Sequence, residues 1–135
     1  MYIVSDFSKM NSIEEYEEIV QNNLRKLDIG IVILNAGVGS MGPFNENQNI
    51  DIQTSVNVNA LQVIYFSKVI VNQLLKRYDD HKLKSGILVT SSLLGERPFP
   101  GMLTYSASKS LAGFIAEGLN FELQGKVDVL NYCPS

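Results

Sequence analysis

The stretch SGILVTSSLLGERPFPGMLTYSASKSLAGFIAEGLNFELQGKVDVLNY, residues 85–132, determines the fold. It opens with an apolar run at 85–90, continues through a loop at 93–104 rich in glycine and proline, and ends in another strand-like run at 126–132. The residues between the loop and the second run, 105–123, are typical of a helix. Two buried strands joined by a helix predict parallel pairing, because parallel strands need such a crossover connection.

The same alternation continues upstream of this stretch. A β-branched run at 29–34 predicts a buried strand. Residues 51–77 predict a long helix buried on more than one side, because their apolar side chains spread widely around the helix. A capping box of Ser12 and Glu15 starts a predicted helix at 12–26, and residues 1–5 resemble a further strand. We therefore expect one α/β domain with a doubly wound, Rossmann-like parallel sheet.

Composition excludes several classes of function. The chain has 135 residues, of which 45% are hydrophobic and 19% charged, as in ordinary globular proteins. A net charge of -3, with no basic cluster longer than Lys76-Arg77, argues against a nucleic acid partner. No Cys/His spacing suggests a metal site, and no apolar run approaches the ~18 residues of a membrane span. We expect no metal and no membrane segment in this chain.

Polar residues follow the predicted strands at the end where ligands bind in open α/β sheets. They are Asp6, Asn35, Ser91 and Ser92. Tyr105 and Lys109 lie four residues apart, which places both side chains on one face of the following helix. A nearby ammonium favours the phenolate form of a tyrosine, and a serine hydroxyl can stabilise charge on a substrate oxygen. This grouping indicates carbonyl/alcohol redox chemistry, with a cofactor supplying the hydride.

The Tyr-x-x-x-Lys spacing alone is weak evidence, since an amphipathic helix carries such a pair on a solvated face by chance. Its context favours function, because the pair starts a helix after a Gly/Pro loop and after a strand ending in two serines. His81 is interpreted as a solvated loop residue, and Cys133 as a buried thiol with no activating base beside it.

The chain resembles the short-chain dehydrogenase/reductase family along essentially its whole length. Four motifs carry the resemblance: Leu34-Asn-Ala-Gly37, Val58-Asn-Ala60, Thr90-Ser-Ser92 and Tyr105-Ser-Ala-Ser-Lys109. The resemblance implies that Tyr105 is the acid/base, that Lys109 is its electrostatic partner and that Ser92 polarises the carbonyl. It also implies that Asn59 holds a water in a proton relay from Lys109.

The same resemblance implies a set of residues that bind the cofactor. Asp6 is similar to the acidic residue that contacts adenine, and Asn35, Ala36 and Gly37 would border the adenosine. Tyr105 and Lys109 would contact the nicotinamide ribose. Pro134 corresponds to the first residue of the family's Pro-Gly, which here reads Pro134-Ser135.

The sequence also departs from the family pattern. The glycine-rich loop that binds the pyrophosphate should precede Asp6 and is absent, as are the first two strands of the sheet. Gly37-Val-Gly-Ser-Met-Gly42 fits the spacing of such a loop but is followed by Pro43 and a polar stretch, so we interpret it as an ordinary loop. We expect residues 1–135 to be a partial catalytic domain truncated at both ends.

Within the family, Glu117-Gly-Leu-Asn-Phe-Glu-Leu123 and Lys126-Val-Asp-Val129 suggest the branch of 17β-hydroxysteroid and very-long-chain 3-oxoacyl-CoA reductases. That branch implies NADP in preference to NAD, and a steroid, 3-oxoacyl or other lipid-like ketone as the small-molecule substrate. The family also implies a homodimer through the two long helices. The compartment stays open: cytoplasmic for the chain as given, or the endoplasmic reticulum if an N-terminal anchor has been lost. The alternative is a truncated or noncatalytic relative that acts only by association.

Overall fold

The computed structural model describes residues 2–135, and its centre is a parallel sheet of three strands. The strands are β1 (Ile31–Leu34), β2 (Ser85–Thr90) and β3 (Val127–Tyr132), in the order β1-β2-β3. Ile33 is paired with Leu88, and Leu88 with Leu130. The arrangement confirms the predicted Rossmann-like parallel sheet, with a helix crossing between each pair of neighbouring strands.

The helical elements alternate with the strands. They are α1 (Ile13–Ile19), η1 (Val20–Leu24), η2 (Phe44–Glu46), α2 (Asn49–Val56), η3 (Asn57–Leu61), α3 (Gln62–His81), η4 (Leu93–Gly95) and α4 (Leu103–Glu122). The Glu15 carboxylate accepts from the backbone N–H of Ser12 at 3.0 Å, as the capping box predicts. The elements α2, η3 and α3 follow one another without a break, and η3 is a π-helical turn inside this long helix.

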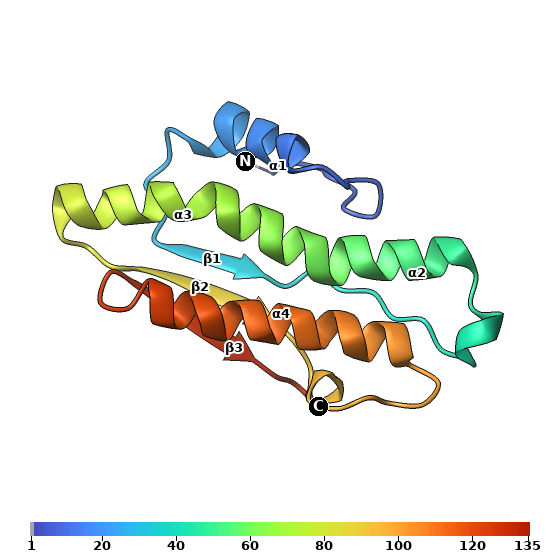
Figure 1. Cartoon of the computed structure of the whole chain (residues 1–135). Helices are drawn as coiled ribbons and strands as arrows, with labels where there is room; N and C mark the ends of the chain where they lie inside the picture. The colour runs from blue at the N-terminus through green and yellow to red at the C-terminus, as the bar shows by residue number, and fades with distance from the viewer. Residues whose placement is uncertain (1) are drawn as a thin grey trace.

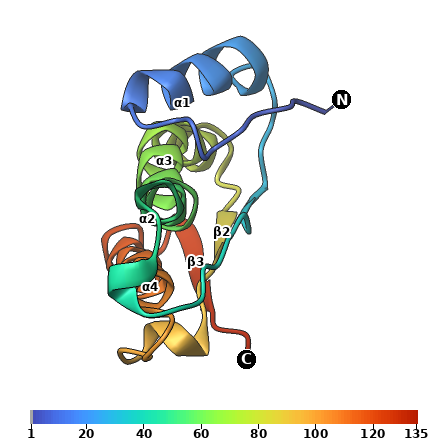
Figure 2. The ribbon, with the colours of Figure 1, turned by 90° about the vertical axis from the view of Figure 1, so that its right-hand side faces the viewer.

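The helices of the described chain gather on one side of the sheet (Figures 1 and 2). Side chains from β1, β2 and β3 form a core with α3 and α4, in which Val89, Ile70 and Ala112 are fully buried. Helix α1 packs on α3 rather than on the strands. On the other side of the sheet Ile31 and Ile33 of β1 are 71% and 62% exposed, so this apolar face is open within residues 2–135.

The long helix at 49–81 is long and apolar enough to span a membrane by length and composition alone. This differs from the expectation drawn from the sequence, which found no such run. Its side chains Val63, Ile70 and Leu74 are buried in the core between the sheet and the neighbouring helices. An apolar face turned toward a core is what the central helix of a soluble domain shows as well.

The strand predicted at residues 1–5 is not formed over residues 2–5, the part of it that the structure describes. Met1 lies outside the described residues, and residues 2–5 have no regular secondary structure, with Tyr2 90% and Val4 87% exposed. The chain that follows is held on the helical side, where the carbonyl of Ser8 accepts from the Asn57 amide at 2.9 Å and Phe7 stacks on Tyr16. Apolar residues form a strand only with a hydrogen-bonding neighbour, and residues 2–5 have none.

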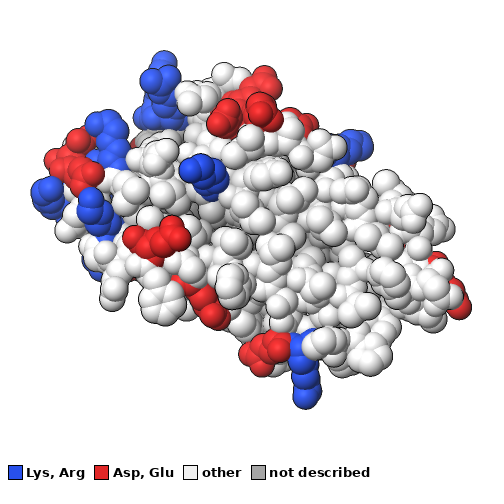
Figure 3. Space-filling view, in the orientation of Figure 1, with Lys and Arg blue, Asp and Glu red and all other residues white. Residues whose placement is uncertain are grey.

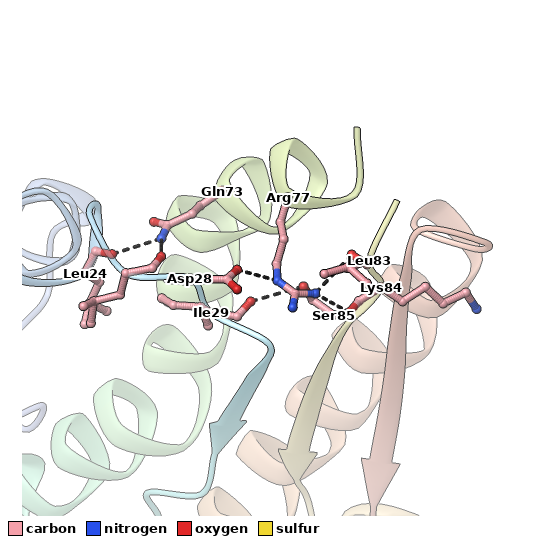
Figure 4. Close-up of polar contacts among 9 residues, drawn as sticks. Leu24, Asp28, Ile29, Gln73, Arg77, Leu83, Lys84 and Ser85 are labelled. Carbon is pink, nitrogen blue, oxygen red and sulfur yellow. Dashed lines mark hydrogen bonds and ion pairs between the residues drawn. The ribbon is translucent and has the colours of Figure 1, made fainter. Parts of the chain in front are cut away.

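Arg77, near the end of α3, ties together the loops that enter β1 and β2 (Figure 4). Its guanidinium donates to the Asp28 carboxylate at 2.6 Å and to the carbonyls of Leu83 and Lys84 at 3.1 and 2.6 Å. The Ser85 hydroxyl donates to the Ile29 carbonyl at 3.2 Å. These bonds fix the entry to the two strands, and the opposite end of the sheet carries the candidate site.

Candidate active site

A pocket of about 780 Å³ opens beyond the carboxyl ends of the strands. It is lined by the loops that follow β1 and β2, by the start of α4 and by the last two residues of the chain. Of the residues predicted for the site, it brings together Asn35, Gly37, Ser92, Tyr105, Lys109 and Pro134. Ligands in open α/β sheets bind at this end of the strands, so the pocket lies where such a fold places its site.

Ser92 caps the short helix η4 and is almost fully buried. Its hydroxyl oxygen accepts a hydrogen bond from the backbone N–H of Leu94 at 3.2 Å. Because that contact uses a lone pair, the hydroxyl hydrogen stays available to donate into the pocket. The neighbouring Ser91 differs, since its hydroxyl donates to the Asn131 side chain at 2.6 Å and lies 3.0 Å from the sulfur of Cys133.

Lys109 is buried although it carries an amino group. Its Nζ donates to the backbone carbonyl of Thr90, the last residue of β2, at 2.7 Å. Burial lowers the pKa of Lys109 from its usual value of 10.5, because the charged form loses hydration. A Cβ added at Gly37 would lie 3.1 Å from the same Nζ, so the bare glycine backbone lets the lysine approach the loop after β1.

Tyr105 lies in the first turn of α4, half-buried on the same pocket wall as Lys109. The hydroxyl of Ser108 donates to the Tyr105 carbonyl at 2.7 Å and accepts from the amide of Asn59 at 3.0 Å. Ser108 therefore joins the helix that carries Tyr105 and Lys109 to the π-helical turn η3. The Tyr-x-x-x-Lys pattern contains Ser108 but gives no sign of this contact.

Asn59 is fully buried in η3, and its side chain holds the loop after β1. Its Oδ1 accepts from the Val38 N–H at 2.8 Å, and its Nδ2 donates to the Val38 carbonyl at 2.8 Å. This pair of bonds fixes the loop beside Gly37, against which Lys109 lies. The structure thus shows Asn59 in a supporting contact, whereas the water relay expected from the resemblance remains a prediction.

Only some of the residues predicted to bind the adenosine half of a cofactor line this pocket. Asn35 lines the pocket and accepts from the Thr90 hydroxyl at 2.9 Å, while Ala36 is half-buried beside it and is not part of the lining. Asp6 lies elsewhere, on an exposed turn, where it pairs with Lys9 at 3.1 Å. The Ser8 and Lys9 contacts hold the pKa of the Asp6 carboxyl below its usual range.

The loop at 37–42 has the structure of an ordinary connection. Gly42 adopts a φ of +133°, its N–H donates to the Gly101 carbonyl at 2.9 Å, and the short helix η2 follows at Phe44. A dinucleotide-binding loop would lead directly into a long helix whose N-terminus faces the phosphates. The interpretation of these glycines as an ordinary loop therefore agrees with the structure.

The residues present fit the nicotinamide and ribose half of a dinucleotide. Tyr105 and Lys109 provide an O–H and an amino group, which suit the hydroxyls of a ribose. A Cβ at Gly37 would crowd the Lys109 amino group, so the bare glycine keeps that group close to the loop after β1. The pocket is also bounded by Pro134, whose carbonyl accepts from the Leu93 N–H at 3.2 Å.

The parallel Rossmann-like sheet and the pocket beyond the carboxyl ends of its strands define an open α/β protein that binds its ligand at this end of the sheet. The particular arrangement, with a strand-end serine and a Tyr-x-x-x-Lys helix on one pocket, narrows the class further. A sequence profile described as short chain dehydrogenase matches residues 1–135. The chain belongs to the short chain dehydrogenase family.

Comparison with individual proteins agrees with this assignment. A very-long-chain 3-oxoacyl-CoA reductase of Anas platyrhynchos is 30% identical over 92% of the chain, and one of Neurospora crassa is 33% identical over 92%. The solved bulky-bulky ketone specific alcohol dehydrogenase of Comamonas testosteroni superposes on 98% of the chain with a TM-score of 0.81 and 27% identity. The chain spans 38% and 36% of the two reductases and 50% of the solved chain.

Proposed function

We propose that this chain provides the catalytic part of an NAD(P)-dependent oxidoreductase that interconverts a carbonyl and an alcohol. The observation that carries the proposal is that Ser92, Tyr105 and Lys109 line the same pocket. Gly37 and Asn35 line it as well. The family supports the reaction type, because the relatives include reductases of 3-oxoacyl-CoA.

In this proposal a bound nicotinamide would supply the hydride, while side chains of this chain polarise the substrate oxygen and transfer a proton to it. The Ser92 hydroxyl, which already accepts from Leu94, donates its hydrogen to the substrate carbonyl oxygen. The Tyr105 hydroxyl transfers a proton to the oxygen as negative charge develops there. Lys109, held by the Thr90 carbonyl, stabilises the phenolate that remains and contacts the ribose.

We propose NADP(H) in preference to NAD(H), on the resemblance to the 3-oxoacyl-CoA reductase branch. The proposed cofactor contacts are those of Asn35, Gly37, Tyr105, Lys109 and Pro134, which share one pocket. Asp6 and Ala36 stay outside this pocket, so their assignment to the cofactor rests on the resemblance alone. Parallel titrations with NADPH and NADH test the choice, and equal or tighter binding of NADH would contradict it.

The walls of the pocket favour an apolar carbonyl compound such as a steroid, a 3-oxoacyl chain or another lipid-like ketone. Four apolar lining residues come from the loop between β2 and α4, and a fifth, Val38, comes from the loop after β1; the four are Leu93, Leu94, Phe99 and Met102. Apolar walls with a few convergent polar groups are typical of sites that bind small apolar ligands.

The test is consumption of NADPH by the purified chain with a panel of apolar ketones, compared with Tyr105→Phe. The phenylalanine variant keeps the ring and removes the proton donor, so we expect turnover to fall by about 10²- to 10⁴-fold, the usual contribution of a general acid. Unchanged ketone-dependent turnover in Tyr105→Phe would refute the role of Tyr105. Absence of turnover by the wild-type chain would favour the second hypothesis.

The second hypothesis is a noncatalytic relative that acts by association. The open face of the sheet favours it, because Ile31, Ile33 and Leu130 are 71%, 62% and 58% exposed, and β1 is an edge strand within the described chain. Exposed apolar edges of this kind promote pairing with another chain. Absence of NADPH binding together with self-association through this face would support the second hypothesis.

We also propose a homodimer through the long helices. Phe114 and Phe121 of α4 are 79% and 77% exposed, and the small residue Gly118 lies between them. In Figure 3 the charged side chains lie mainly toward the left-hand end and the margins of the helical face, and the middle of this face carries few of them. Sedimentation velocity tests this proposal: Phe114→Asp should convert a dimer to a monomer, and a wild-type monomer at high concentration would contradict it.

A further inference from the structure

The pocket has an unbalanced charge. Among the residues that line it within residues 2–135, the positively charged side chains are Lys109 and Arg97, and no aspartate or glutamate lies on its walls. Lys109 is buried, and its amino group is hydrogen-bonded to the Thr90 carbonyl at the end of β2. Arg97 is exposed at the rim, on the loop between β2 and α4.

Arg97 is not neutralised by the protein. Five cations of the described chain form ion pairs with carboxylates: Lys9, Lys76, Arg77, Lys84 and Lys126. No carboxylate of residues 2–135 lies within 4 Å of the Arg97 guanidinium. The adjacent Glu96 lines two smaller pockets, one of which Arg97 also borders, and it does not line this pocket. In a chain of net charge -3, Arg97 thus makes the rim locally positive.

The loop that carries Arg97 is anchored to the start of α4. The Phe99 N–H donates to the Ser106 hydroxyl at 3.4 Å, and the Met102 N–H donates to the Phe99 carbonyl at 3.0 Å. The Gly101 carbonyl accepts from the Gly42 N–H at 2.9 Å, which joins this loop to the one after β1. Arg97 is therefore held on the same wall as the apolar side chains of Leu94, Phe99 and Met102 rather than on a free tail.

We propose that the substrate is a ketone with an apolar chain that ends in an anionic group, a carboxylate or a phosphate, and that Arg97 binds this group. The inference rests on the proposed function, because it takes the Ser92 and Tyr105 end of the pocket as the place of the carbonyl. The apolar walls contact the chain between the carbonyl and the anion. A planar guanidinium binds carboxylate and phosphate oxygens in pairs, which a lysine cannot do.

The test measures binding of matched probes by isothermal titration calorimetry. The probes are 9-oxodecanoate, its uncharged methyl ester, and 8-oxononyl phosphate, which has the same number of methylene groups between ketone and anion. The proteins are the wild-type chain, Arg97→Gln and the control Arg25→Gln. Arg25 is another exposed arginine outside ion pairs, bonded to Gln21 and absent from this pocket.

The wild type should bind the keto acid about fivefold to tenfold more tightly than its ester, as expected for one charge-assisted contact at a partly exposed site. Arg97→Gln should lose this preference, Arg25→Gln should keep it, and added salt should weaken it. Tighter binding of the phosphate than of the keto acid would assign the anion as a phosphate, and the reverse order would assign it as a carboxylate.

Equal binding of acid and ester by all three proteins would overturn the inference and leave the proposed function intact, because the carbonyl pocket would still bind its ligand. Absence of binding by every probe would also overturn it, and the proposed function would then depend on the NADPH assay with Tyr105→Phe. NADPH affinity should be unchanged in Arg97→Gln. A loss of NADPH affinity would instead place Arg97 on the cofactor and contradict its assignment to the substrate.

Discussion

Replacement of Gly95 by alanine tests how the short helix η4 and the helix α4 hold the site together. Gly95 ends η4, which begins after Ser92. A Cβ at this position would lie 2.8 Å from the backbone carbon of Lys109, 2.8 Å from the backbone nitrogen of Ser110 and 3.1 Å from the Lys109 carbonyl oxygen. Those atoms belong to the backbone of α4, so the contact cannot be relieved by a side-chain rotation.

The cost of Gly95→Ala follows from this crowding. Carbon atoms pack at about 3.5–4.0 Å, so η4 and α4 must separate by several tenths of an ångström. Overpacking of this kind destabilises a protein by about 1–3 kcal/mol. Because the movement separates Ser92 from Lys109, NADPH affinity should fall as well. Urea unfolding followed by far-UV circular dichroism gives the free energy of unfolding.

Gly118→Ala is the matched control at protein concentrations where the chain is monomeric, because it adds one methyl group to α4 where no atom of residues 2–135 beyond the neighbouring helix backbone lies within 4 Å. Alanine in a helix interior is favoured over glycine by about 0.5–1 kcal/mol, so this variant should be more stable than the wild type. A free energy of unfolding for Gly95→Ala within about 0.5 kcal/mol of the wild type, the range of neutral surface substitutions, would refute the crowding at Gly95. An equal loss of stability in Gly118→Ala and Gly95→Ala would refute it as well.

Two further predictions concern parts of the fold outside the site. Arg77→Ala should lower the free energy of unfolding by about 2–3 kcal/mol, because the Asp28 and Lys84 contacts are charge-assisted hydrogen bonds, and Arg77→Lys should restore less than half of the loss. Urea unfolding measures both, and wild-type stability in Arg77→Ala would refute the anchoring role. Burial raises the pKa of Tyr16 to about 12, and its hydroxyl has no hydrogen-bond partner within residues 2–135. At neutral pH Tyr16→Phe should therefore be equally stable or gain up to about 1 kcal/mol. Above pH 10 the unfolded phenol releases its proton while the folded one keeps it, so the wild type should lose stability between about pH 10 and 12 and Tyr16→Phe should lose less. Parallel losses in pH-dependent unfolding would contradict the buried, unpartnered hydroxyl.

Much of the central fold could be predicted from local sequence. Residues 85–90 form a strand with the predicted bounds, because a short apolar run between a polar turn and two serines has few alternatives. Residues 2–5 have similar apolar character but form no strand, since strand formation depends on a neighbour that the sequence pattern does not reveal. The π-helical turn η3 carries no residue signature, and it holds the buried Asn59 whose amide fixes the loop after β1.

The site was predictable where its residues follow strand ends or share a helix face. Ser92, Tyr105 and Lys109 therefore could be expected to converge, and they line one pocket. The Thr90 carbonyl that binds Lys109 could not be found in the same way, because every residue has a carbonyl and only the folded position selects one. The place of Arg97 depends on the path of a loop, for which periodicity gives no information.

We propose above all that the pocket beyond β2 binds the nicotinamide and ribose half of the cofactor through Lys109. The measurement that tests it most directly is fluorescence titration of the chain with NADPH, beside Lys109→Ala and the control Lys68→Ala, an exposed lysine of α3. We predict saturable binding by the wild type and Lys68→Ala, weakened about tenfold or more in Lys109→Ala, since one lost charge-assisted hydrogen bond contributes ~1.5–3 kcal/mol. Equal binding by Lys109→Ala and the wild type, or no binding by the wild type, would contradict the claim.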